Sequence, residues 1–252
     1  MTSPASDAPA PRLSLVVTTF RETDVLAGSL PRIAATLRGL PGAAELLFVD
    51  DGSGDGTPDW VRSQFPLYAD LAPRLFIHEV NRGRGAALVT GFREALGTHV
   101  GYMDLDLEVD STYLPACLDA LDRGADVALA HRTYVEVRDG FDLRTFLSLG
   151  YRHLSKFVLR HDLHDTEAGY KFFRRTALRR LLPEVRESGW FFDTEIVMLA
   201  WLARLRIEEI PVEFRRRDDK VSTVKIGRDV RRYLVALLRF GSRRAAVTRA
   251  LR

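Results

Sequence analysis

The chain has 252 residues, of which 46% are hydrophobic and 28% are charged, a composition typical of a soluble globular protein with one large core. A single cysteine, Cys117, excludes an internal disulfide and a four-cysteine metal site, and it fits a reducing compartment. No segment reaches the roughly 18 uncharged apolar residues that a membrane-spanning helix needs. Residues 1–12 have neither a basic start nor an apolar block, so we expect a disordered leader rather than a secretion signal.

Strands and helices are predicted to alternate along the first half of the chain. This alternation favours an α/β fold with a mostly parallel, doubly wound sheet flanked by helices. No linker after residue 12 is long enough to divide the chain into separate domains. The strands are expected at 13–18, 45–50, 74–78, 99–103 and 126–130, and the helices at 24–38, 57–65, 84–96 and 112–122.

Three of the predicted strands run directly into hydroxyl, carboxylate or glycine residues. They lead into Thr18 to Glu22, into Asp50 to Thr57 and into Asp104 to Asp106. In open α/β sheets, ligands bind beyond the carboxyl ends of the strands. One acidic, glycine-rich turn would be common, because these residues favour turns. Three such strand ends together indicate a ligand site.

The segment 81–87, Asn-Arg-Gly-Arg-Gly-Ala-Ala, resembles part of a dinucleotide fingerprint. It lacks the third glycine, and no acidic residue follows at the ribose-binding distance, so we reject NAD binding. Glycines before a helix can still bring backbone N–H groups to a phosphate, with Arg82 and Arg84 adding positive charge. The alternative is a glycine-rich helix start that carries two solvated arginines.

Asp104 and Asp106 flank one residue directly after a predicted strand. On an extended segment both carboxylates point the same way. Two hard oxygen ligands at this spacing suit Mg²⁺ or Mn²⁺ bridging to a substrate diphosphate. Such a metal would neutralise the charge that develops on a departing diphosphate.

The C-terminal part of the chain is basic. Between residues 216 and 252 twelve Lys or Arg stand against three Asp, which suits an anionic partner. Apolar residues at helical spacing predict an amphipathic helix, which either lies on a membrane surface or docks on its own domain. A second amphipathic segment, 141–160, is expected to pack in the core or against a partner, with a bilayer as the alternative. The apolar positions of the C-terminal helix are Val230, Leu234, Leu237, Leu238 and Phe240.

Six blocks of this sequence, in this order and spacing, resemble glycosyltransferase family 2 and, within it, the dolichyl- or polyprenyl-phosphate sugar synthases. The resemblance covers residues 12–240 and implies a Rossmann-like GT-A fold in a single domain, 13–240, followed by a basic tail, 241–252. It also implies a metal-dependent hexosyltransferase that inverts the anomeric carbon of a nucleoside diphosphate sugar. The six blocks are residues 16–22, 49–57, 81–86, 104–107, 165–175 and 190–195.

The resemblance assigns most of the strand-end residues to the sugar donor. Asp104 and Asp106 would hold the metal, and Arg82, Gly83 and Arg84 would lie near the phosphates. Arg132 occupies the family's arginine position and would meet either phosphate. An ionised carboxylate such as Asp51 accepts but does not donate, which suits a ribose or base N–H contact. The residues expected at the nucleobase and ribose are Thr18, Phe20, Glu22, Asp50, Asp51 and Ser53.

The resemblance assigns a second group of residues to the acceptor. Gly169 would allow close backbone approach, and Lys171 would meet an anionic acceptor unless it is a solvated charge at a helix start. Asp193 and Glu195 lie on an otherwise apolar segment, where ionisable groups are costly unless used or paired. For Glu195 the alternative is a buried salt bridge to Lys171 or Arg174.

The acceptor chemistry bears on whether a base is needed. A lipid phosphate is already ionised, whereas a hydroxyl acceptor needs a base, and Asp193 or Glu195 would be the candidates.

Arg215 and Ser222 are expected near an acceptor phosphate. The chain departs from the family at Arg21 in place of an asparagine, at Arg84 in place of a lysine and at Ser222-Thr223-Val224-Lys225.

Several alternatives stay open at this stage. The acceptor is a polyprenyl phosphate or a soluble molecule such as a secondary metabolite, and UDP-glucose and GDP-mannose are both tenable donors. Other functions are a sugar nucleotidyltransferase and a degenerate nucleotide-binding module. We expect a cytoplasmic protein, with the basic helix either on the inner face of an anionic membrane or in a homodimer, and no nucleic-acid partner.

Overall fold

The structure is a computed structural model, and it describes residues 10–134, 154–215 and 226–251. Its centre is a seven-stranded sheet in the order β3-β2-β1-β4-β6-β5-β7. β1 pairs in parallel with β2 and β4, and only β6 runs antiparallel to its two neighbours, β4 and β5. The mostly parallel sheet predicted from the sequence is therefore confirmed. The strands are β1 (Leu13–Thr19), β2 (Ala44–Asp50), β3 (Arg74–Ile77), β4 (His99–Met103), β5 (Val127–Tyr134), β6 (Tyr170–Arg174) and β7 (Ile207–Phe214).

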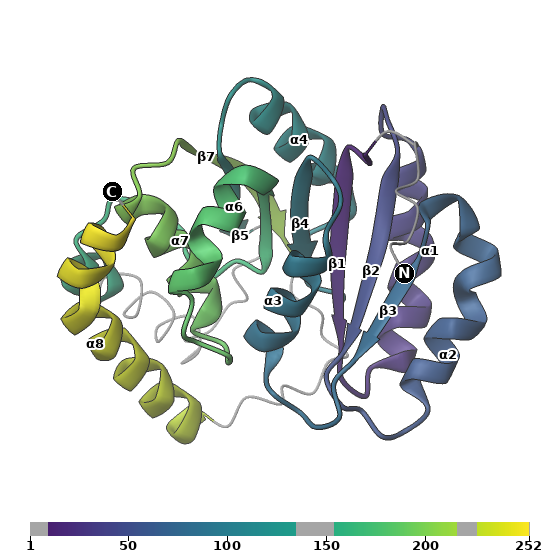
Figure 1. Cartoon of the computed structure of the whole chain (residues 1–252), viewed down its shortest axis with the longest axis horizontal. Coiled ribbons are helices and arrows are strands. Elements are labelled where there is room, and N and C mark those ends of the chain that lie inside the picture. The colour runs from purple at the N-terminus through teal and green to yellow at the C-terminus, as the bar shows by residue number, and fades with distance from the viewer. Residues whose placement is uncertain (1–9, 135–153, 216–225, 252) are drawn as a thin grey trace, which may run out of the picture.

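Helices cover both faces of the sheet, and α2 and α8 lie at opposite ends of the molecule (Figure 1). Each predicted helix of the first half has a counterpart in the structure. A further short helix occupies 154–159. The α-helices are α1 (Thr23–Arg38), α2 (Thr57–Gln64), α3 (Arg84–Glu94), α4 (Leu114–Asp122), α6 (Arg175–Leu181), α7 (Phe192–Leu202) and α8 (Ile226–Ala250), and the 3₁₀ turns are η1 (Phe65–Leu71), η2 (Ser111–Tyr113) and η3 (Leu182–Glu184).

The core has two layers because the central strands are buried on both faces. Val16 of β1 packs with α3, α7 and α8, whereas Leu15 and Val17 pack with α1 and α4. Successive side chains of a strand point to opposite faces, so a strand with both faces covered is apolar throughout. This explains the unbroken apolar runs in the sequence.

The parallel register brings the polar ends of three strands to one edge of the sheet. Thr19 of β1 pairs with Asp50 of β2, and Val16 pairs with Tyr102 of β4, just before Asp104. The carboxyl ends of β1, β2 and β4 therefore lie side by side, as the sequence predicted.

The antiparallel strand β6 was not predicted from the sequence. It separates β4 from β5 and places Lys171 opposite Tyr102. Gly101 makes room for it, since a Cβ there would overlap the ring of Phe172. The insertion of β6 brings residues 168–171 next to the end of β4.

The C-terminal helix α8 packs on α7 and on the helix at 154–159. A Cβ at Gly241 would lie 3.3 Å from Val158, and Val247 and Leu251 belong to the core. The boundary expected at residue 240 thus falls inside α8. Most of the segment 141–160 lies outside the described residues. Of the helices in the described part of the chain, none combines the length and apolarity needed to cross a bilayer.

Candidate active site

The carboxylates at the end of β2 hold the surrounding loops in place. Asp50 is fully buried and accepts hydrogen bonds from Thr19 Oγ1 at 3.2 Å and from Ser53 N at 2.9 Å. Ser53 in turn accepts one from Arg21 N at 2.9 Å. Asp50 and Ser53 therefore fix the turn after β2 and tie it to the loop after β1.

Asp51 joins the same turn to the loop before α3. Its two oxygens accept hydrogen bonds from Arg82 N at 2.9 Å and Gly83 N at 2.7 Å, and His78 Nδ1 lies 2.7 Å away. A carboxylate has about four lone-pair sites, so these partners leave acceptor capacity. The expected contacts of Asp50, Asp51 and Ser53 with a nucleotide sugar stay predictions. The same holds for Thr18, Phe20 and Glu22, at and after the end of β1.

The start of α3 is covered by another part of the chain. The carbonyl of Ser188 accepts hydrogen bonds from Gly85 N at 2.7 Å and Ala86 N at 3.3 Å. A Cβ at Gly85 would lie 2.7 Å from Phe192 Cβ, so the glycine permits this close packing. Two of the N–H groups expected to bind a phosphate are thus bonded to protein.

The two arginines of this loop differ in their surroundings. Arg82 is exposed, but the side chain of Arg84 is only 15% exposed, so the alternative of two solvated arginines is wrong for Arg84. Arg84 Nη2 lies 2.6 Å from Asp104 Oδ1, and Nη1 pairs with Asp193 Oδ2. Burial opposes the charge on Arg84, but Asp193 and Asp104 raise its pKa above the ordinary value. Arg84 therefore links the end of β4 to the start of α7.

Asp193 is the centre of a buried network of charges. Its Oδ1 accepts hydrogen bonds from Tyr102 Oη at 2.6 Å and from Lys171 Nζ at 3.0 Å. Burial lowers the pKa of Lys171, and burial would raise the pKa of Asp193 if Arg84 and Lys171 did not hold it below the ordinary value. Lys171 is completely buried on β6, so the alternative of a solvated charge at a helix start is wrong.

Asp104 stands over a glycine at the entrance to this network. Its N–H donates to the carbonyl of Gly169 at 2.8 Å, and any Cβ at Gly169 would overlap the Asp104 carboxylate. The lack of a side chain at Gly169 therefore makes room for the Asp104 carboxylate, in addition to the close backbone approach expected from the sequence. Within the described residues, no group of three or more His, Cys, Asp or Glu is arranged as a ready metal site. Asp104 and Asp106 supply two carboxylates, so a metal held there would complete its coordination with water or with ligands from the substrate.

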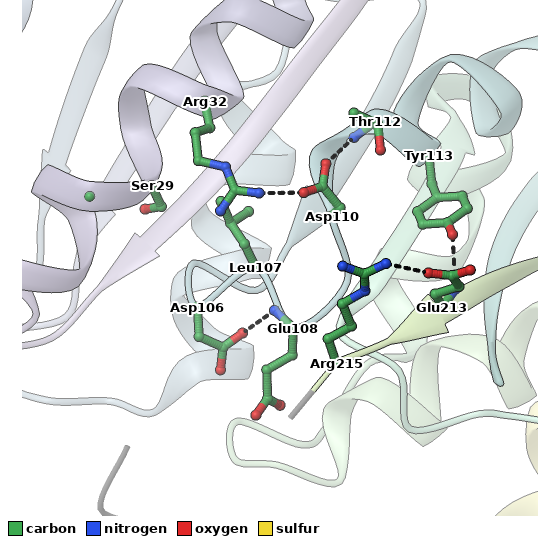
Figure 2. A pocket seen from close by; sticks show the side chains of 11 residues that line it. Ser29, Arg32, Asp106, Leu107, Glu108, Asp110, Thr112, Tyr113, Glu213 and Arg215 are labelled. Carbon is green, nitrogen blue, oxygen red and sulfur yellow. Dashed lines mark hydrogen bonds and ion pairs between the residues drawn. The ribbon is translucent and has the colours of Figure 1, made fainter. Parts of the chain in front are cut away.

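A cavity of about 680 Å³ opens beside Asp106, between α1, the loop after β4 and the end of β7 (Figure 2). Glu108 N donates to Asp106 Oδ1 at 3.3 Å, and both residues line the cavity. Glu108 was not singled out in the sequence, although it follows Asp106 by two residues on the same loop. Arg215 also lines the cavity and lies 3.0 Å from Glu213.

Arg132 lines a smaller pocket together with Asp104, Asp106 and Gly169. Its guanidinium forms a two-pronged pair with Asp165, with Nε–Oδ2 at 2.6 Å and Nη2–Oδ1 at 3.0 Å. It is therefore close to the predicted metal ligands, and its contact with a phosphate stays a prediction. Ser222 lies outside the described residues.

Glu195 has other partners than Asp193. Its Oε2 accepts hydrogen bonds from Arg186 N at 3.0 Å and Glu187 N at 2.8 Å, and its Oε1 lies 3.0 Å from Arg243 of α8. Burial raises the pKa of Glu195. The alternative of a buried salt bridge at Glu195 is confirmed, but its partner is Arg243 and not Lys171 or Arg174. Lys171 pairs with Asp193 instead.

The chain is similar to known glycosyltransferases over most of its length. The chain is 30% identical to the polyprenol monophosphomannose synthase of Mycolicibacterium smegmatis, over 95% of this chain and 91% of that protein. It is 27% identical to the dolichyl-phosphate beta-glucosyltransferase of Saccharomyces cerevisiae, over 86% of this chain and 72% of that protein. It is 30% identical to glycosyltransferase AglD of Haloferax volcanii over 88% of this chain, but it spans only 36% of that protein's length.

The fold is also that of solved glycosyltransferase structures. The glucosyl-3-phosphoglycerate synthase of Mycobacterium tuberculosis, solved with Mn²⁺, UDP-glucose and phosphoglyceric acid, matches with a TM-score of 0.68 at 18% identity, over 92% of this chain and 80% of that one. The family model for "Glycosyl transferase family 2" matches residues 14–182, which include Asp51, Arg84, Asp104 and Lys171. The chain therefore belongs to glycosyltransferase family 2.

Proposed function

We propose that this protein transfers a sugar from a nucleoside diphosphate sugar to a polyprenyl phosphate, with inversion at the anomeric carbon. One observation carries the choice of acceptor: both carboxylates that were candidates for a base are already bonded to protein groups. Asp193 accepts from Arg84, Lys171 and Tyr102, and Glu195 is tied to backbone N–H groups and to Arg243. Against the effect of burial, Arg84 and Lys171 hold the pKa of Asp193 below its ordinary value, and protein donors occupy both oxygens of Glu195. Neither carboxylate is therefore placed to take a proton from an acceptor, and an ionised phosphate needs no base.

The proposed donor site is the edge where β1, β2 and β4 end. Asp104 and Asp106 fit a divalent metal, because the Asp104 side chain is 47% exposed and already attracts a cation, the Arg84 guanidinium. Mg²⁺ or Mn²⁺ held there would neutralise charge on the leaving diphosphate. Arg84 bonds to Asp104, and Arg132 lines a pocket with Asp104 and Asp106, so both arginines would orient the phosphates. The buried network around Asp193 would keep Arg84 in place.

We further propose that α8 and the helix at 154–159 contact the cytoplasmic face of a membrane. The apolar side chains of Leu238 and Phe157 are 63% and 83% exposed, and Leu234 and Val235 of α8 are also exposed. Exposed arginines 231, 232 and 239 lie on the same helix. Apolar and basic side chains together suit a surface of anionic lipid, where the acceptor would be embedded.

The direct test is release of nucleoside diphosphate from UDP-, GDP- and dTDP-sugars with Mn²⁺ or Mg²⁺, with and without a short polyprenyl phosphate. We expect release that requires both lipid phosphate and metal. It should be lost in Asp106→Asn and kept in Asp119→Asn, which removes the same charge from an exposed position on α4. Formation of a nucleoside triphosphate and a sugar 1-phosphate when pyrophosphate is added to the same donors would instead indicate a nucleotidyltransferase, and no turnover of any donor would overturn the proposal.

A further inference from the structure

Arg84 bonds to two carboxylates that differ in their surroundings. Asp193 is buried and keeps Lys171 and Tyr102 as partners in addition to Arg84. Asp104 is half-exposed and lines the smaller pocket together with Asp106 and Arg132. Water and ions compete with an exposed ion pair far more than with a buried one. The bond to Asp104 is therefore the one that can open.

The rest of the guanidinium is held in place. The Arg84 Cζ lies 5.3 Å from the ring centre of Tyr102 and 5.6 Å from that of Trp190. Both rings can bind a cation through their faces. With Nη1 paired to Asp193, the side chain stays at the site when Nη2 loses Asp104. A lysine has one charged nitrogen and could not hold two carboxylates with a planar fork in this way.

We propose that Arg84 competes with the divalent metal for Asp104, and that the nitrogen released from Asp104 then binds the diphosphate of the donor. The proposal rests on the proposed function in one respect, which is that Asp104 is a metal ligand. Arg84 would weaken metal binding while the nucleotide is absent. A diphosphate would provide Nη2 with a new anionic partner, so metal and nucleotide would each strengthen the binding of the other.

The experiment is a titration of Mn²⁺ followed by the electron paramagnetic resonance signal of the free ion. Wild type, Arg84→Gln and Arg82→Gln would be compared without nucleotide, and wild type and Arg84→Gln also with UDP or GDP. We expect Arg84→Gln to bind Mn²⁺ about tenfold more tightly than wild type without nucleotide, as the loss of one charge-assisted bond implies. We also expect the nucleotide to tighten Mn²⁺ binding less in Arg84→Gln than in wild type.

Arg82→Gln is the matched control, because it removes the same charge from the same loop at an exposed position. Its Mn²⁺ affinity without nucleotide should stay within twofold of wild type. Equal affinities of wild type and Arg84→Gln, equal tightening by both arginine substitutions, or no Mn²⁺ binding by any variant would each overturn the proposal. Arg84→Gln removes one of the two charged partners of Asp193, so we expect a lower melting temperature than that of wild type. A single cooperative thermal transition above the temperature of the titration would show that the variant is folded.

The Mn²⁺ titration and the sugar-transfer assay test the role of Arg84 and the proposed function separately. If wild type transfers no sugar but Mn²⁺ binding responds to Arg84 as expected, the proposed function fails and the role of Arg84 stands. If transfer occurs and Mn²⁺ affinity does not depend on Arg84, the role of Arg84 fails alone.

Discussion

Lys171 and Asp193 form an ion pair in the interior, with 3.0 Å between Nζ and Oδ1 and with 0% and 5% of their side chains exposed. The lysine comes from β6 and the aspartate from the first turn of α7. Tyr102 of β4 bonds to the same carboxylate. The pair therefore fixes α7 against the sheet directly beside the proposed metal ligands.

Removal of the lysine should destabilise the fold. Lys171→Met leaves Asp193 buried with one charged partner fewer, and breaking a buried ion pair costs about 3–5 kcal/mol. The free energy of unfolding in urea measures this loss. Arg93→Met removes a charge from an exposed position of α3 and should change the stability by less than about 0.5 kcal/mol. Equal stability of the two variants would contradict the role of the pair.

The stability that Asp193 contributes should depend on pH. Its partners hold the pKa of Asp193 below 3.8, the ordinary value of an aspartate, so the unfolded chain takes up the proton first. The contribution is then fully present above about pH 4 and is lost as the pH falls below it. The difference in unfolding free energy between wild type and Asp193→Asn should be constant from pH 5 to 7 and shrink in acid. A difference that grows in acid would refute this assignment.

A methyl group at position 169 should damage the site more than the fold. Gly169→Ala would push the Asp104 carboxylate aside, and that side chain can turn toward solvent. We expect Mn²⁺ affinity to fall at least about tenfold, measured by paramagnetic resonance, with a melting temperature close to that of wild type. Gly189→Ala is the control, because a Cβ there meets nothing within 4 Å. Unchanged Mn²⁺ binding in Gly169→Ala would argue against Asp104 as a ligand.

The pair between Glu195 and Arg243 should hold α8 on the domain. Arg243→Gln leaves a buried carboxylate without its charged partner, and we expect a loss of about 1.5–3 kcal/mol of unfolding free energy. Arg249→Gln, at an exposed position of the same helix, should be neutral. If both variants unfold at the same urea concentration, Glu195 does not depend on Arg243.

Membrane contact should depend on the two most exposed apolar residues of α8 and the helix at 154–159, which are Leu238 and Phe157. The double variant Phe157→Asp, Leu238→Asp places charge on both helices and should sediment much less with vesicles that contain anionic lipid. Leu67→Asp changes an equally exposed leucine on η1 and should sediment like wild type. Equal sedimentation of the double variant and wild type would exclude this surface as the membrane contact.

The sequence predicted the helices and parallel strands of the first half, because β1, β2 and β4 are largely apolar on both faces and because β2 and β4 run directly into aspartates. It did not predict β6, since the order of strands depends on long-range packing such as that of Gly101 against Phe172. The strand-end carboxylates were predicted from local pattern. The partners of Asp193 and Glu195 were not, because Arg84, Lys171 and Arg243 approach from different elements of the fold.

The most direct test of the account compares two acceptors that differ only in the phosphate. Wild type would be given the donor sugar nucleotide identified by the panel, Mn²⁺, and either a short polyprenyl phosphate or the matching polyprenol. The absence of a free carboxylate base at Asp193 and Glu195 predicts release of nucleoside diphosphate with the lipid phosphate and none above background with the alcohol. Equal or faster release with the alcohol would contradict the account.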